Sequence, residues 1–163
     1  MNYTNDNIDK ICNFYMSDWH FIVMVLPYIN KQISQKTKVI TCLERDVIDK
    51  VQFLIEKLSL KNKEEILKIN WKKTEIKNFK KYIKDDLKKE NNKILIINGS
   101  NYYIEEINKI LSDTINNEKC KCKNIKIIDC YDFESNKDDM NAILKKYRGI
   151  LNTSGEATIK EIM

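Results

Sequence analysis

Five short apolar runs, each followed by a polar cluster and a stretch with helical periodicity, constrain the fold of this chain most. The runs are Ile11–Met16, Lys38–Leu43, Leu67–Trp71, Ile94–Ile97 and Ile125–Cys130. Strands buried on both faces of a parallel sheet have such near-continuous apolar runs, and helices make the crossovers between them. We therefore predict an α/β fold: a three-layer, doubly wound, mainly parallel five-stranded sheet with helices on both faces.

The stretches between the runs carry apolar residues at helical spacing. We expect helices at about residues 19–35, 45–58, 74–89 and 102–116, a short helical turn at 62–66 and a last helix after Asp138. Ser17 or Asp18 suits the N-cap of the first helix, because a short side-chain oxygen can accept a free backbone N–H of the first turn. That helix is apolar almost all round, so we expect it to be deeply buried or shared with a partner.

The length of 163 residues is ordinary for one domain. There is no internal repeat and no linker rich in Pro, Gly or Ser, so we expect a single α/β domain over residues 1–163 with its core at about 11–151. Residues 152–163 have little apolar content, and we expect them to form a mobile end or a partner-dependent segment.

The charge pattern argues against a nucleic-acid partner. The 29 Lys and Arg residues outnumber the 24 Asp and Glu residues, which gives a net charge of +5. Only Arg45 and Arg148 are arginines, although proteins that read nucleic acids favour arginine for bidentate contacts. We interpret the lysines, which are scattered among acidic residues, as solvated helix surfaces rather than a patch for nucleic acid or membrane.

The five cysteines and the N-terminal residues bear on the compartment. An odd number of cysteines, with no apolar signal segment near Met1, indicates a reducing cytosol. The longest near-apolar segment, Phe21–Ile29, is much shorter than the roughly 20 residues that span a bilayer. We therefore predict a cytoplasmic protein without a membrane span.

Cys120 and Cys122 could form an exposed redox pair or, with Cys130, bind a soft metal. Zinc usually takes four ligands in paired spacing, which this chain does not supply, so we predict no metal site. Cys12, Cys42 and Cys130 are interpreted as core residues.

Glycine is scarce, with only Gly99, Gly149 and Gly155 in the chain. Phosphate-binding loops need glycines that let backbone N–H groups close on phosphate oxygens. Neither the P-loop motif G-x-x-x-x-G-K-[ST] nor the dinucleotide motif G-x-G-x-x-G occurs in the sequence. This excludes an ordinary P-loop ATPase and an ordinary dinucleotide site, and we predict no cofactor. Ile125–Asp129 is similar to the strand and acid that hold Mg²⁺ in nucleotide hydrolases, but without a phosphate loop we interpret it as a plain strand end.

The carboxyl ends of parallel strands meet at one edge of the sheet, where α/β proteins bind ligands. Aromatic side chains with a few polar groups fall there, which is typical of a small-molecule pocket, although ordinary packing under the loops is the alternative. The candidate ligand contacts are Tyr15, Asp18, Trp19, His20, Glu44, Trp71, Asn98, Ser100 and Tyr131. We assign no catalytic residue, but Asp18 and the sole histidine, His20, leave open a small hydrolase or transferase.

Two stretches resemble the MEDS domain, the sensory domain of DcmR-type regulators. The first contains Phe14-Tyr15, Phe21, Pro27–Ile29 and Lys38–Ile40; the second contains Cys130–Phe133, Ala142–Leu144 and Ile150-Leu151. The spacing agrees over most of residues 11–151, but Lys31–Lys36 stands where the family has a glycine-containing turn.

The resemblance implies a fold similar to RecA/KaiC-like ATPases without the phosphate loop. It also implies a sensory or regulatory role in signal transduction rather than catalysis. The expected partner is a small-molecule ligand or a signalling protein, with a homo-oligomer as a further option. Because the chain has no room for an attached output domain, we expect it to act in trans. A protein-interaction module that docks through the helix at residues 19–35 is the remaining alternative.

Overall fold

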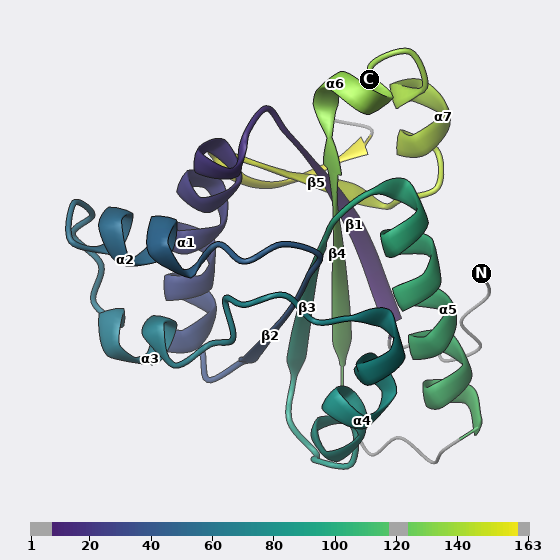
Figure 1. Ribbon diagram of the computed structural model, residues 1–163, viewed down its shortest axis with the longest axis horizontal. Coiled ribbons are helices and arrows are strands. Elements are labelled where there is room, and N and C mark those ends of the chain that lie inside the picture. The colour runs from purple at the N-terminus through teal and green to yellow at the C-terminus, as the bar shows by residue number, and fades with distance from the viewer. Residues whose placement is uncertain (1–7, 118–123, 160–163) are drawn as a thin grey trace.

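The computed structural model describes residues 8–117 and 124–159 and contains one six-stranded sheet in the order β2-β3-β4-β1-β5-β6 (Figure 1). The strands are β1 (Ile8–Tyr15), β2 (Lys38–Leu43), β3 (Lys93–Asn98), β4 (Ile125–Asp132), β5 (Gly149–Asn152) and β6 (Gly155–Thr158). All neighbours are parallel except β5 and β6, which are antiparallel. The predicted mainly parallel α/β sheet is confirmed, with six strands in place of five.

Helices cover both faces of the sheet, as predicted. One face packs against α1 (Asp18–Ser34), α2 (Ile48–Ile55) and α3 (Lys63–Leu67), and the other against α4 (Ile76–Leu87), α5 (Asn101–Asn117) and α7 (Met140–Leu144). The short α6 (Phe133–Asn136) directly follows β4. In Figure 1 the first group lies on the left of the sheet and the second on the right. The two faces thus have separate apolar cores.

The first helix begins at the expected cap. The Ser17 Oγ accepts the backbone N–H of His20 at 3.1 Å, which satisfies one free donor of the first turn. The sheet side of α1 is fully buried, including Phe21 and Ile22, but Trp19 and Val23 on its outer side are 43% and 42% exposed. The nearly all-apolar sequence of α1 therefore reflects a deeply buried helix that still keeps an exposed apolar stripe.

The helix that follows β1, α1, packs on the face of the sheet opposite α5. The chain leaves β1, passes over β4 and β3 with α1 on one face, and forms β2. It then returns through β3 and β4 to β5 with α4, α5 and α7 on the opposite face. Strand β1 therefore has its following helix on the α1 face, and it shares the core of the α5 face with α5 and α7.

The predicted strand at Leu67–Trp71 is wrong. Helix α3 ends at Leu67, and the following turn brings the buried Trp71 indole N–H to the Ile66 carbonyl at 2.8 Å. The alternation of Leu67, Ile69 and Trp71 resembles a strand, but Leu67 is 38% exposed while Ile66 and Trp71 are buried. The buried set therefore does not have the period of a strand.

This segment instead covers the outer edge of β2. The Thr41 hydroxyl donates to the Asn70 carbonyl, and the Thr74 N–H donates to the Leu43 carbonyl at 2.8 Å. Tyr82 on α4 donates its hydroxyl to the Thr41 carbonyl at 3.0 Å. The Thr41 and Leu43 carbonyls and the Thr41 hydroxyl on this edge are thus bonded without a further strand.

The segment expected to be a mobile end forms a hairpin over residues 149–158 instead, while residues 160–163 lie outside the described ranges. Gly155 has φ of +106°, a left-handed conformation that glycine adopts readily between β5 and β6. Leu151 is 1% exposed in the core, and its carbonyl accepts Asn13 Nδ2–H at 2.9 Å. Glu156 on β6 pairs with Lys126 on β4 at 2.7 Å. A short, polar sequence was a poor guide here because its partners lie far away in the chain.

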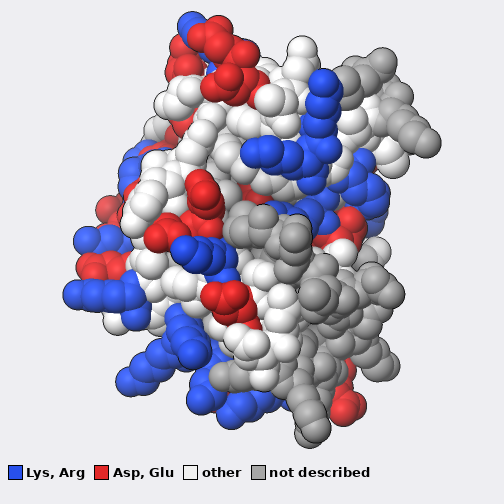
Figure 2. All heavy atoms as spheres, turned by 90° about the vertical axis from the view of Figure 1, so that its right-hand side faces the viewer, with Lys and Arg blue, Asp and Glu red and all other residues white. Residues whose placement is uncertain are grey.

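Charged side chains of both signs are interspersed over the face shown in Figure 2, without one sign covering it. Within residues 8–117 and 124–159, no helix has the length and apolar character needed to cross a bilayer.

We expect Leu151→Ala to lower the free energy of unfolding by about 2–5 kcal/mol, because it opens a cavity under the C-terminal hairpin. Urea denaturation followed by circular dichroism measures this change. Thr153→Ala, at the exposed hairpin turn, is the matched control and should change stability by less than about 0.5 kcal/mol. Equal stability of the Leu151→Ala variant and the wild type would contradict a structural role for the hairpin.

Candidate functional site

The carboxyl ends of β1 to β4 do meet at one edge of the sheet, as their parallel register requires. The candidate residues there do not form one continuous cleft. They lie in a cluster at the ends of β2 and β3, in another at the start of α1, and around Tyr131 at the end of β4, while Trp19 and Trp71 lie elsewhere.

Glu44 and Ser100 connect the carboxyl ends of β2 and β3 by hydrogen bonds. The Ser100 backbone N–H donates to Glu44 Oε1 at 2.6 Å, and its hydroxyl lies 3.3 Å from Oε2. The Asn98 carbonyl accepts the Glu44 N–H at 2.9 Å. A Cβ on Gly99 would lie 2.6 Å from the Tyr103 ring and 2.9 Å from the Glu44 Cβ, so glycine permits this close approach. These candidates bind one another across the ends of β2 and β3.

Asp18 and His20 are each engaged locally at the start of α1. Asp18 accepts a hydrogen bond from Arg45 at 2.6 Å. His20 Nδ1 accepts the Met16 N–H at 2.8 Å, which leaves Nε2 as the ring nitrogen that carries the proton when the imidazole is neutral. Burial raises the pKa of Tyr15, and the nearby Arg45 guanidinium opposes that rise. The structure thus gives Asp18 a partner other than His20.

The two tryptophans lie away from this edge. Trp71 is 1% exposed within the core under α1, α2 and α3. Trp19 packs edge-on against Phe53 of α2, with ring centroids 5.7 Å apart, on the outer surface. Trp19, Val23 and Phe53 form an exposed apolar patch, and Lys50 lies 5.6 Å from the centre of the Trp19 ring.

Among the candidate residues, Tyr131 lines a ligand-sized hollow. A groove of about 400 Å³ lies between α5 and α7, over β1 and β4, and we call it the α5–α7 groove. Its lining residues are Lys10, Asn101, Ile104, Glu105, Tyr131, Ile143, Lys146 and Tyr147. The groove lies on the face opposite α1, the helix that follows β1.

A buried carboxylate lies beneath the groove. Asp129 is fully buried on β4; its Oδ1 accepts Asn108 Nδ2–H at 2.9 Å and its Oδ2 accepts the Tyr147 hydroxyl at 2.6 Å. Lys10 Nζ lies 3.3 Å from Oδ2, and the Tyr131 and Tyr147 hydroxyls are 2.6 Å apart. A buried charge is tolerated when it is paired and hydrogen-bonded, and here the pairing links two strands with α5 and the segment after α7.

Burial is the main cause that raises the pKa values of both groove tyrosines, and the Asp129 charge adds to it. Lys10 Nζ also lies 5.3 Å from the centre of the Tyr147 ring, a cation–π distance. Both phenols therefore stay neutral hydrogen-bond donors at physiological pH. Perturbed titratable groups beside a hollow are a common property of functional sites.

Sequence reasoning missed Lys10, Glu105, Lys146 and Tyr147 as site residues. The groove depends on β4 lying beside β1, and strand order was not readable from the sequence. One usable signal was present: Asp129 interrupts an otherwise apolar run and needs a buried partner.

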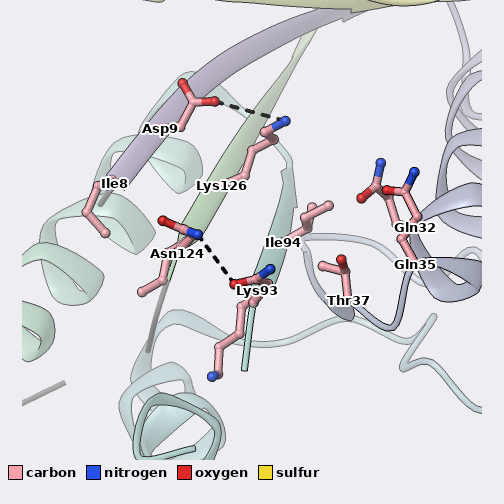
Figure 3. A pocket seen from close by; sticks show the side chains of 11 residues that line it. Ile8, Asp9, Gln32, Gln35, Thr37, Lys93, Ile94, Asn124 and Lys126 are labelled. Atoms are coloured by element: carbon pink, nitrogen blue, oxygen red, sulfur yellow. Dashed lines mark hydrogen bonds and ion pairs between the residues drawn. The ribbon is translucent and has the colours of Figure 1, made fainter. Parts of the chain in front are cut away.

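A second hollow, of about 410 Å³, lies at the opposite edge, between the end of α1 and the amino ends of the strands (Figure 3). Gln32, Gln35 and Thr37 line one side, and Asp9 and Lys126 lie on the strands. The three charged residues of this hollow already have partners. Asp9 binds Arg148 at 2.6 Å, Lys126 binds Glu156 at 2.7 Å, and Lys93 Nζ donates to the Lys89 and Asn91 carbonyls at 2.6 and 3.1 Å. These charged side chains are therefore less available to a ligand than those that line the α5–α7 groove.

The cysteines that the structure describes are buried free thiols. Across the described ranges, no group of three or more His, Cys, Asp or Glu side chains could hold a metal ion. Cys12, Cys42 and Cys130 are buried free thiols, and burial followed by the Asp129 charge raises the pKa of Cys12 to about 12. Such thiols are unreactive at neutral pH. Cys120 and Cys122, the proposed redox pair, lie outside the described residues.

The fold and the groove define an α/β domain with a ligand-sized hollow near the carboxyl half of its sheet. No protein-family model matches the chain, and no similar curated protein or solved structure is found.

We expect Tyr147→Phe to lower the free energy of unfolding at pH 7 by about 1.5–3 kcal/mol, because Asp129 loses one donor. The tyrosine pKa is raised on folding, so its contribution is fully present below the unfolded value of about 10 and is lost as pH rises above it. The difference between wild type and variant should therefore narrow above about pH 10.

Urea titrations between pH 7 and 11 measure this difference in stability. The control is Tyr102→Phe, because Tyr102 is 66% exposed. Its free energy of unfolding should match that of the wild type. A gap that stays constant over the whole pH range would rule out the assigned role of Tyr147.

Proposed function

We propose that this chain is a sensory or regulatory domain that binds a small ligand in the α5–α7 groove. The observation that carries the proposal is the groove itself, of about 400 Å³. Hydrogen bonds among Tyr131, Tyr147 and Asp129 make its floor polar, and it lies on the face opposite α1, the helix that follows β1. Ligand sites of small molecules have volumes of about 300–1,000 Å³, apolar walls and a few placed polar groups.

The position in the fold supports a binding role. The crossovers that follow β1 and β4 lie on opposite faces of the sheet, which makes this adjacent pair a topological switch point. Open α/β sheets bind ligands near the carboxyl ends of strands at such points. Tyr131, near the end of β4, is the expected contact that lines the groove.

The network under the groove supports sensing as the role of ligand binding. Tyr147 lines the groove and also donates to Asp129, which in turn binds Asn108 of α5. A ligand that moves Tyr147 would therefore change contacts inside the core, and a binding event would alter the position of α5 or α7. Both Asp129 oxygens are occupied by protein donors, which favours a structural role for this acid over metal binding or proton transfer.

The resemblance to MEDS domains agrees with a sensory role, and we extend the proposal to membership of that group. Three free buried thiols agree with the proposed cytoplasmic location. A signalling partner, action in trans, the enzyme alternative with Asp18 and His20, and docking through α1 stay predictions from the sequence.

A thermal-shift screen of nucleotides, sugars, carboxylic acids, amines and amino acids tests the function. A ligand at 100 times its dissociation constant should stabilise the fold by about 2.7 kcal/mol. That corresponds to a rise in Tm of about 5–10 °C for a domain of this size. Flat responses to all classes would refute small-ligand binding.

The location is tested with Lys146→Trp, which places a bulky ring at the exposed rim of the groove. This variant should lose the shift, while Lys145→Trp, also exposed but not part of the lining, should keep it. An unchanged shift in the Lys146→Trp variant would place the ligand elsewhere, for example at the amino-edge hollow.

A further inference from the structure

We propose that the ligand of the α5–α7 groove is a small zwitterion, with an ammonium and a carboxylate on either side of an apolar part, as in an apolar amino acid. This inference rests on the proposed function and names the class of ligand that the groove residues would recognise.

The two walls of the groove carry opposite charges. Glu105 lines it from α5 and Lys146 from the segment after α7. In the described part of the chain, neither side chain forms an ion pair with N···O within 4.0 Å. The carboxylate and the ammonium thus belong to the same hollow but do not neutralise each other. A ligand with both charges would pair with both walls at once.

The groove also has an apolar middle. Ile104 on α5 and Ile143 on α7 are 2% and 7% exposed, and both line it. The Tyr131 ring lies on the floor, stacked on Phe14 with centroids 5.8 Å apart. An aliphatic or aromatic side chain of the ligand would bury these apolar surfaces, while a sugar or inorganic ion would leave them exposed to water.

The charge balance of the floor agrees with a ligand without net charge. Lys10 already pairs with the buried Asp129, so its positive charge is matched within the protein. Glu105 and Lys146 then add one charge of each sign. An ion of a single sign would be attracted by one wall and repelled by the other. The volume of about 400 Å³ lies near the lower end of the usual range, which favours an amino acid over a nucleotide.

Isothermal titration calorimetry tests this with free apolar amino acids, beginning with leucine, methionine and phenylalanine. For each amino acid that binds, the N-acetyl derivative lacks the ammonium and the amide derivative lacks the carboxylate. We expect at least one amino acid to bind, and both of its derivatives to bind about 10- to 100-fold more weakly, because each loses a charge-assisted hydrogen bond.

Two variants assign each charge to its wall. Glu105→Gln should weaken the amino acid about tenfold or more and leave the affinity for the N-acetyl derivative unchanged. Lys146→Gln should weaken the amino acid to a similar degree and leave the affinity for the amide derivative unchanged. Asp113→Asn on α5 and Lys145→Gln near α7 are exposed controls that should bind as the wild type does.

The outcomes separate this inference from the proposed function. If a molecule with one charge, or with none, binds and Lys146→Trp blocks it, the groove is a ligand site but the zwitterion is wrong. If amino acids bind and neither wall variant weakens them, the assignment of Glu105 and Lys146 is overturned. If no compound of any class binds, both proposals fail.

Discussion

The buried carboxylate of Asp129 is the interaction on which the arrangement of the molecule most depends. An ionised acid in the interior is costly unless donors surround it, and here Asn108, Tyr147 and Lys10 supply them. These donors come from α5, from the segment after α7 and from β1, so one charge fixes the relative positions of all three. The walls and floor of the α5–α7 groove are parts of the same elements. The shape of the hollow and the stability of the core therefore have a common origin.

Much of the fold was predictable because buried parallel strands leave a direct mark on the sequence. Four of the five apolar runs are strands, and the helices between them follow from their apolar spacing. The run at Leu67–Trp71 failed because its alternation was accidental: the indole of Trp71 turns back onto α3 instead of entering a sheet. The C-terminal hairpin was missed because its strands have four residues each and gain their stability from distant partners such as Asn13 and Lys126.

The candidate site was predictable only as a region. The carboxyl ends of β1 to β4 do lie at one edge, and of the candidates placed there Tyr131 lines the groove. Lys10 could not be chosen, because it lies in the amino half of β1 and approaches the site only through the register with β4. Tyr147 had the spacing of an ordinary core residue. Bonds within the protein occupy Asp18, His20, Glu44 and Ser100, and such bonds use the same polar residue types that a ligand site would use.

The way in which β2 is covered has a consequence for behaviour in a crowded solution. An exposed strand edge offers unpaired backbone groups to another chain, and many proteins aggregate through such edges. Here residues 70–74 and the Tyr82 hydroxyl bind the Thr41 and Leu43 carbonyls and the Thr41 hydroxyl along one margin of the sheet. The opposite margin is a strand of only four residues, Gly155–Thr158. The sheet therefore resists growth by strand addition at both sides.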